Sequence, residues 1–404
     1  MIAKNDIGNP GEIIVFTGAQ RPDLLARTSK DDCPLIDLWP EFFDGGASSQ
    51  RYFPRLYELP QLARFQLIAV HTLGGKETIV GNGNSTPFFW TELANIGNDC
   101  ESPRFGAVLR TLPDGGFDTI LARGVNQAVV RKGKKITPGA LTQDQVLDMP
   151  TWTLKNTPNA LSALAIAVLP EWRRYNVAEM LIKEMKEIAK RESLAILVVP
   201  LRPTKKTLFQ DVDMATYAEW RQEAASVPGH GETTVKKSEA LREEINGHQL
   251  AVIEKVDEGI NVEANRRLDG DIRETAKRRI TEKTDKDSDG VSSDNDAVQG
   301  QPKLVPFDPW LRKHVRLGAK IVKVAPVSMT FRGNAAQWEK WTGIDVRQRA
   351  QEMVKLRESV WVQDDKEVPV SFQVKGCLAP MKYYPSRDIG EYVEPNLWLF
   401  HSVV

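Results

Sequence analysis

The chain has few of the residues that build covalent or metal-held frameworks. Only three of its 404 residues are cysteines, Cys33, Cys100 and Cys377, and none belongs to a Cys-x-x-Cys pair. A disulfide framework and a zinc cluster are therefore unsupported, and a reducing compartment is favoured. The five histidines do not form a metal-binding motif at the usual ligand spacings either. We expect a cytoplasmic protein without a metal.

An excess of charge of either sign is also missing. Lys and Arg number 54, and Asp and Glu also number 54, so the formal net charge is zero. This balance disfavours a generally basic nucleic-acid binder and an acidic tail protein. No apolar run approaches membrane-spanning length, and residues 1–13 lack the apolar core of a signal peptide. We expect neither a nucleic acid nor a membrane among the partners.

The most informative stretch that is present lies between residues 161 and 206. Residues 161–169 form an almost wholly apolar run ending at Pro170, which favours a strand buried on both faces. Apolar residues then recur at helical spacing from Val177 to Ala189, with Lys and Glu opposite. A second buried run follows at residues 194–199. A helical crossover between two buried strands implies that the strands are parallel, so the stretch predicts a βαβ unit.

The start of this predicted helix is a candidate anion site. Backbone N–H groups of a first helical turn lack partners within the helix and point outward. Arg173 and Arg174 lie beside them. Such a combination suits a ligand the size of a pyrophosphate. A solvated helix start with ordinary surface arginines explains the same residues, and both interpretations stay open at this point.

The segment resembles the acyl-CoA motif of the GNAT N-acetyltransferase superfamily, Gln/Arg-x-x-Gly-x-Gly/Ala after an apolar strand. Arg173 stands at the Gln/Arg position and Ala178 at the final small position, whereas Asn176 replaces the central glycine. A side chain there could weaken or reposition CoA, because glycine lets the pyrophosphate approach the backbone closely. The resemblance implies acetyl-CoA or another acyl-CoA as co-substrate, contacted by Val168, Arg173, Arg174, Tyr175, Asn176, Val177 and Ala178.

The resemblance extends to both sides of the motif. Residues 65–73 and 78–83 are strand-like runs joined by a Gly-Gly pair, which predicts a hairpin. They look like the central antiparallel strands that precede the CoA-binding strand in GNAT folds. Further strands are predicted at residues 320–328 and 394–401. The resemblance implies an α/β (mixed α+β) fold with a twisted mixed sheet flanked by helices.

Composition divides the chain into four parts. Residues 221–303 are charged and poor in apolar residues, so we interpret them as an insertion, partly helical and then disordered. Residues 50–220 and 304–404 are then two parts of one GNAT-like domain, because the second part has too few periodic elements to close a sheet alone. Residues 1–49 form an N-terminal extension.

The catalytic residues are less clear from the sequence. Many GNAT members place a glutamate base on the first CoA-binding strand, but residues 161–169 contain no carboxylate. Tyr217 lies roughly where the family places a tyrosine acid, although packing against neighbouring aromatic residues also explains it. His314 is a candidate base because its ordinary pKa suits neutral pH. Ser328 and Glu394 are explained equally by an acceptor pocket or by exposed strand ends.

Two functions from different classes follow. The resemblance implies an acyl-CoA-dependent N-acyltransferase that transfers an acetyl group to a small-molecule amine by direct attack on the thioester. The alternative is a GNAT-fold protein without acyl transfer, which binds a ligand or partner or catalyses another reaction. Asn176 and the carboxylate-free strand favour this alternative.

Overall fold

The computed structural model describes residues 11–30, 32–131, 156–224, 304–357 and 369–403. The chain divides into two units, of which the first combines Met1–Gln222 with Val305–Val404 and the second is Glu223–Leu304. The predicted insertion lies outside the described residues from position 225 onward.

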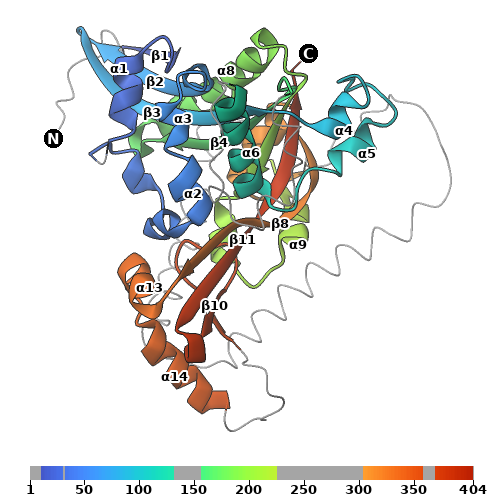
Figure 1. Ribbon diagram of the computed structural model, residues 1–404. Coiled ribbons are helices and arrows are strands. Elements are labelled where there is room, and N and C mark those ends of the chain that lie inside the picture. Colours follow the sequence, from blue (N-terminus) through green and yellow to red (C-terminus); the bar gives the residue numbers. More distant parts are fainter. Residues whose placement is uncertain (1–10, 31, 132–155, 225–303, 358–368, 404) are drawn as a thin grey trace, which may run out of the picture. The chain divides into compact units, whose positions relative to one another are not determined.

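Nine strands of the described chain form one mixed sheet in the first unit (Figure 1). Their order is β1-β2-β3-β4-β5-β11-β10-β9, and β8 pairs with β11 as a branch. The bounds are β1 Glu12–Thr17, β2 Gln66–Leu73, β3 Lys76–Phe88, β4 Ala160–Val168, β5 Ile196–Leu201, β8 Lys320–Gly333, β9 Val370–Phe372, β10 Met381–Tyr384 and β11 Ile389–Ser402. All pairs are antiparallel except β4 with β5, which is parallel. The predicted fold class is therefore confirmed.

The helices are short, apart from those that cover the sheet. Their bounds are α1 Pro22–Thr28, α2 Ala47–Tyr52, α3 Arg55–Glu58, α4 Thr91–Ala94, α5 Phe105–Leu109, α6 Gly116–Arg131, α8 Val177–Arg191, α9 Met214–Glu219, α12 Pro309–Arg316, α13 Ala335–Thr342 and α14 Val346–Arg357. A two-stranded sheet consists of β6 (Arg221–Glu223) and β7 (Leu304–Pro306). Among the described helices, none combines the length and the apolar character that crossing a membrane requires.

The predicted β2–β3 hairpin is confirmed. Gly74 and Gly75 have φ angles of 56° and 77°, so both occupy the left-handed region that a tight hairpin turn of this kind requires. β3 continues five residues past its predicted end at residue 83, to Phe88, although the added residues are mostly polar. Hydrogen bonds satisfy two of these buried side chains: Ser85 Oγ donates to the Phe65 carbonyl at 2.8 Å, and Asn84 Nδ2 donates to Tyr57 Oη at 2.9 Å.

The predicted βαβ unit is also confirmed as β4, α8 and β5, with the 3₁₀ turn η5 (Pro170–Tyr175) between β4 and α8. Two glycines of β3 explain how closely α8 packs on the sheet. A Cβ atom at Gly81 would lie 3.2 Å from Val177 Cγ1 of α8, and one at Gly83 would lie 2.8 Å from Met185 Cε of α8. A larger residue at either position would therefore require these side chains of α8 to move.

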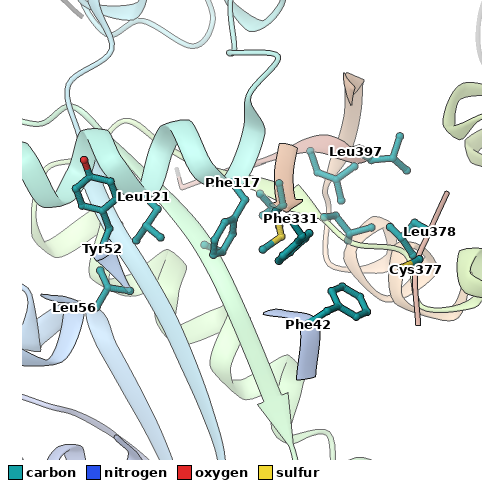
Figure 2. Close-up of a cluster of buried hydrophobic side chains, with 14 of the residues drawn as sticks. Phe42, Tyr52, Leu56, Phe117, Leu121, Phe331, Cys377, Leu378 and Leu397 are labelled. Carbon is teal, nitrogen blue, oxygen red and sulfur yellow. The ribbon is translucent and has the colours of Figure 1, made fainter. Parts of the chain in front are cut away.

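Helices α6 and α8 cover opposite faces of the sheet. Alternate residues of a strand point to opposite faces, and both Gly81 and Gly83 face α8. Thr86, three residues after Gly83, instead lies against Gly124 of α6, where a Cβ atom would come within 2.1 Å of Thr86 Oγ1. Figure 2 shows part of the core on the α6 side, where Phe117 and Leu121 lie near Phe331 of β8.

Both ends of the described chain contribute to this sheet. Residues 1–49, which composition sets apart as an extension, supply α1 and the edge strand β1, which pairs with β2 and was not predicted. Residues 304–404 supply four of the nine strands. The predicted strands at 320–328 and 394–401 are present as β8 and β11, each longer than predicted. The four-part division of the chain remains a prediction.

Candidate active site

Strands β4 and β5 separate along their length. Their parallel ladder contains two pairs, Leu161 with Leu197 and Ser162 with Val198. The next residues of β4 stay paired with β3 on the other side, but the register shifts so that Leu164 is an extra, bulged residue. Residues 164–166 are partly exposed although they lie in the middle of the sheet. The carboxyl-terminal half of β4 thus leaves backbone groups free to pair with an extended ligand.

The start of α8 follows directly from this strand. Asn176 precedes the helix and has φ 59° and ψ 21°, in the left-handed region. Its carbonyl accepts from the N–H groups of Glu179 at 2.9 Å and Met180 at 3.1 Å, which closes the first turn. The N–H groups of Val177 and Ala178 have no partner within the helix and lie at its positive end. Asparagine is among the few residues that enter the left-handed region readily, so its side chain does not prevent the turn.

The two arginines of the motif are held differently. Arg173 Nε donates to the carbonyl of Val168, at the end of β4, at 3.2 Å. The Arg174 guanidinium lies 4.9 Å from the centre of the Tyr175 ring, and its Nη2 donates to the Tyr175 hydroxyl at 2.9 Å. Residues 173–176 are all exposed. The structure therefore places Arg173, Arg174, Tyr175 and Asn176 together on one exposed turn after β4. The other predicted cofactor-binding residues flank this turn, and of these Val168 and Val177 have buried side chains.

The left-handed residue gives a first testable prediction. We expect Asn176→Val to lower the free energy of unfolding by about 1–2 kcal/mol, because a β-branched residue is strained at this φ. Asn176→Gly should leave stability within about 1 kcal/mol of the wild type, because glycine adopts this conformation freely. Urea unfolding measures both variants. The control is Glu187→Val on the exposed side of α8, which should cost about 0.5 kcal/mol. Equal stability of Asn176→Val and the control would contradict the prediction.

A buried ion pair lies at the carboxyl end of β5. Arg202, the first residue after the strand, donates from Nε to Glu394 at 2.9 Å and 3.0 Å and from Nη2 to the Gly376 carbonyl. The Tyr392 hydroxyl also donates to Glu394, at 2.7 Å. Burial opposes the charge of Arg202, but the carboxylate of Glu394 beside it raises the pKa of Arg202 overall. Arg202 was not predicted as a site residue.

The interpretation of Ser328 and Glu394 as exposed strand ends is wrong, because both side chains are 0% exposed. Ser328 Oγ donates to Asn396 Oδ1 at 2.6 Å and accepts from the N–H of Phe117 at 2.9 Å. Both residues therefore join β8 and β11 to their neighbours inside the core.

The first turn of α6 brings one further carboxylate to this region. Asp118 Oδ2 accepts from the N–H of Thr330 in β8 at 3.2 Å. Burial of this side chain, with a smaller contribution from Glu394, raises the pKa of Asp118 to about 7. Sequence reasoning missed Asp118, because a single aspartate at a helix start is usually explained by capping.

Tyr217 lies in α9, beyond the carboxyl end of β5. Its side chain is buried, and its ring centre lies 5.3 Å from that of Trp220. The hydroxyl donates to Asp308 Oδ2 at 3.1 Å, and Asp308 also caps α12. Burial and the carboxylate of Asp308 raise the pKa of Tyr217. The proton of Tyr217 is thus already engaged, and a role as catalytic acid stays a prediction.

His314 lies in α12, toward the end of the β4–β5 pair at which the two strands are still paired. Its Nδ1 is 3.0 Å from Nε2 of His401, and both side chains are buried. Burial, with a smaller contribution from His401, lowers the pKa of His314 to about 3. His401 is opposite Leu197, which belongs to the short stretch where β4 and β5 are still paired. The structure therefore does not bring His314 to the split, the region where β4 and β5 have separated, and its role as a base stays a prediction.

Within the described residues, no group of three or more His, Cys, Asp or Glu side chains is placed to hold a metal ion. Arg202, which follows β5 directly, pairs with Glu394, and Asp118 of α6 accepts from the N–H of Thr330 in β8. The site thus offers an exposed basic turn on the α8 side of the sheet and carboxylates on the α6 side.

The chain is similar in sequence or in structure to several known proteins. The chain is 26% identical over 389 residues to the arginine N-acetyltransferase avaD of Aspergillus versicolor, covering 96% of this chain and 93% of that protein. No family model matches the chain. The loading GNATL domain of CurA from Lyngbya majuscula is 12% identical with a TM-score of 0.32, covering 78% of this chain and 88% of that one. The polyamine N-acetyltransferase of Drosophila melanogaster is 12% identical with a TM-score of 0.23, covering 46% and 75%. The chain is thus similar along nearly its whole length to an N-acetyltransferase.

Proposed function

We propose that this chain transfers an acetyl group from acetyl-CoA to an amine nitrogen of a small-molecule acceptor. The observation that carries the proposal is the parallel pair β4–β5, which is joined at two residue pairs and then open beside the basic turn at residues 173–176. The named relative is an arginine N-acetyltransferase, so arginine is the first acceptor to test.

The residues of this chain would hold the two ends of the coenzyme differently. The pyrophosphate would bind the N–H groups of Val177 and Ala178, with Arg173 and Arg174 supplying positive charge. The exposed backbone of residues 164–166 would pair with the amide groups of the pantetheine arm. Both contacts fix the thioester relative to the sheet, which is the orientation that direct acyl transfer requires.

The chemical step is a direct displacement. The lone pair of the acceptor nitrogen attacks the thioester carbonyl carbon, the carbon–sulfur bond breaks, and CoA leaves as a thiolate. The nitrogen loses one proton, and the thiolate gains one. A backbone N–H beside the bulge at Leu164 is a candidate donor to the oxygen that becomes negatively charged.

A binding module without acyl transfer is the alternative, and the carboxylate-free strand β4 favours it. Thermal unfolding and turnover separate the two. Acetyl-CoA at about 100 times its Kd should raise the stability by about 2.7 kcal/mol, whereas adenine should not. With arginine, or with a polyamine, mass spectrometry should detect a monoacetylated product. Stabilisation without any product would favour the binding module. No stabilisation by acetyl-CoA would contradict the proposed acetyl transfer and favour the interpretation of the basic turn as a solvated helix start.

A further inference from the structure

Asp118 is a titratable side chain of α6 with few partners among the described residues. Its carboxylate accepts the Thr330 N–H and forms no ion pair with another described residue. The side chain is partly exposed, whereas Glu394 is 0% exposed. One oxygen of Asp118 is thus left to interact with a ligand.

The strand register relates Asp118 to the carboxyl end of β5. Thr330, which binds Asp118, is paired with Val393 of β11. The next residue of β11, Glu394, binds Arg202, which follows β5 directly. Asp118 therefore belongs to the end of the sheet at which β4 and β5 have separated.

Asp118 also lies on the face of the sheet that an acceptor would use. It belongs to α6, which covers the face opposite α8. The basic turn stands at the start of α8, so a coenzyme bound there and extended through the split would present its thioester toward α6. An amine attacking from the α6 side would meet the thioester near Asp118.

Other carboxylates of the region are already occupied. Glu394 accepts from Arg202, from Tyr392 and from Asn396, the last at 3.2 Å. Asp308 accepts from Tyr217 and from the backbone N–H groups of Lys205, Trp310 and Leu311. Strand β4 contains no carboxylate at all. Of the three carboxylates Glu394, Asp308 and Asp118, Asp118 is thus the one that can accept a further proton.

We propose that Asp118 is the general base that removes a proton from the attacking nitrogen of the acceptor. The proposal rests on the function proposed above. As the nitrogen attacks the thioester carbon and the carbon–sulfur bond breaks, the Asp118 carboxylate accepts the proton that the nitrogen loses. The CoA thiolate then takes a proton from solvent.

The electrostatic surroundings suit this role. Burial raises the pKa of Asp118 to about 7, the neighbouring charge of Glu394 on β11 adds to it, and the Thr330 N–H on β8 opposes it. Arg202 is engaged by Glu394 and offsets the charge of that residue. A base is most effective when its pKa lies near the working pH, because it is then both available and basic enough.

The test compares Asp118→Asn with wild type in the full chain, using acetyl-CoA and whichever acceptor the wild type acetylates best. Asparagine retains an oxygen that can accept the Thr330 N–H. We expect kcat/KM to fall about 10²–10⁴-fold, while the Kd for acetyl-CoA stays within twofold. The wild-type kcat/KM should rise as the pH increases through about 7. This rise should be absent from the pH profile of the variant. Asp118→Glu should recover part of the rate.

The matched control is Asp114→Asn, two residues before α6, where a 64% exposed side chain pairs with Lys323. Its kcat/KM should stay within threefold of wild type. If Asp118→Asn kept near-normal activity and the same rise of kcat/KM with pH, the assignment of the base would be overturned, but the proposed function would not. A wild-type kcat/KM that does not rise between about pH 6 and 8 would also overturn the assignment of Asp118 as the base, even if the variant failed to fold. An inactive wild type that still binds acetyl-CoA would overturn both this inference and the proposed function.

Thermal unfolding distinguishes a general base from a residue with a purely structural role. The folded-state pKa of Asp118 is raised, so the folded protein binds this proton more tightly than the unfolded chain. The wild type should therefore lose stability as the pH rises from about 4 to about 7, and Asp118→Asn should lack this loss. Above pH 7 the variant should have a Tm equal to or higher than that of the wild type. A lower Tm at every pH together with retained activity would indicate a structural residue and contradict the proposal.

Discussion

Arg202→Ala is expected to lower the free energy of unfolding by about 3–5 kcal/mol, because it leaves a buried carboxylate without its cation. Glu394 is 0% exposed and receives two of its hydrogen bonds from Arg202 Nε. The remaining donors, Tyr392 and Asn396, cannot neutralise its charge. The free energy of unfolding of this variant should be lower than that of the wild type at both pH 5 and pH 8.

Urea unfolding at the two pH values measures this effect. The control is Arg332→Ala, whose partner is Glu391 on the same strand as Glu394 but whose own side chain is 71% exposed. An exposed pair of this kind contributes at most about 1 kcal/mol. The double variant Arg202→Met with Glu394→Gln should recover part of the stability, because no charge is then left buried. A loss below about 1 kcal/mol in Arg202→Ala would show that water reaches Glu394 when the arginine is removed.

The parts of the fold that follow from the sequence are those in which a local pattern determines the packing. The apolar run at residues 161–169 can be buried on both faces only in the interior of a sheet. The apolar residues at helical spacing after Val177 predict a helix that connects this strand to the next one. β1 was not predicted, because six residues at a sheet edge carry little pattern of their own. The end of β3 was not predicted either, because its buried Asn84 and Ser85 are satisfied by groups some twenty residues away.

The residues of the candidate site likewise fall into those that a local sequence pattern predicts and those that it does not. The basic turn at residues 173–176 is contiguous, so its composition alone predicts an anion site. The pair of Arg202 and Glu394 joins residues 192 positions apart, and no spacing rule connects them. Asp118 reaches β8 across 212 positions. A carboxylate base supplied by a distant helix instead of by β4 therefore becomes visible only when the strand register is known.

Arg173→Glu is expected to weaken acetyl-CoA binding about 100-fold, the largest effect on the coenzyme that one exposed residue of this chain should have. The variant replaces an attraction for the pyrophosphate by a repulsion, at the end of α8 where the helix dipole also favours anions. Calorimetric titration with acetyl-CoA measures the loss. Because residue 173 is exposed, added salt should reduce the difference between variant and wild type.

Lys190→Glu is the matched control, because it makes the same change of charge at an exposed position near the other end of α8. If only the net charge of the protein mattered, both variants would weaken binding alike. If the start of α8 binds the pyrophosphate, Lys190→Glu should change the Kd less than threefold, since the added charge lies about 20 Å along the helix, beyond the screening length at physiological salt. Arg173→Glu should also keep a Tm within a few degrees of wild type, because it loses a single partly exposed hydrogen bond to the Val168 carbonyl. An unchanged Kd in a folded Arg173→Glu protein would therefore show that the coenzyme binds elsewhere, and the open end of the β4–β5 pair would need another ligand.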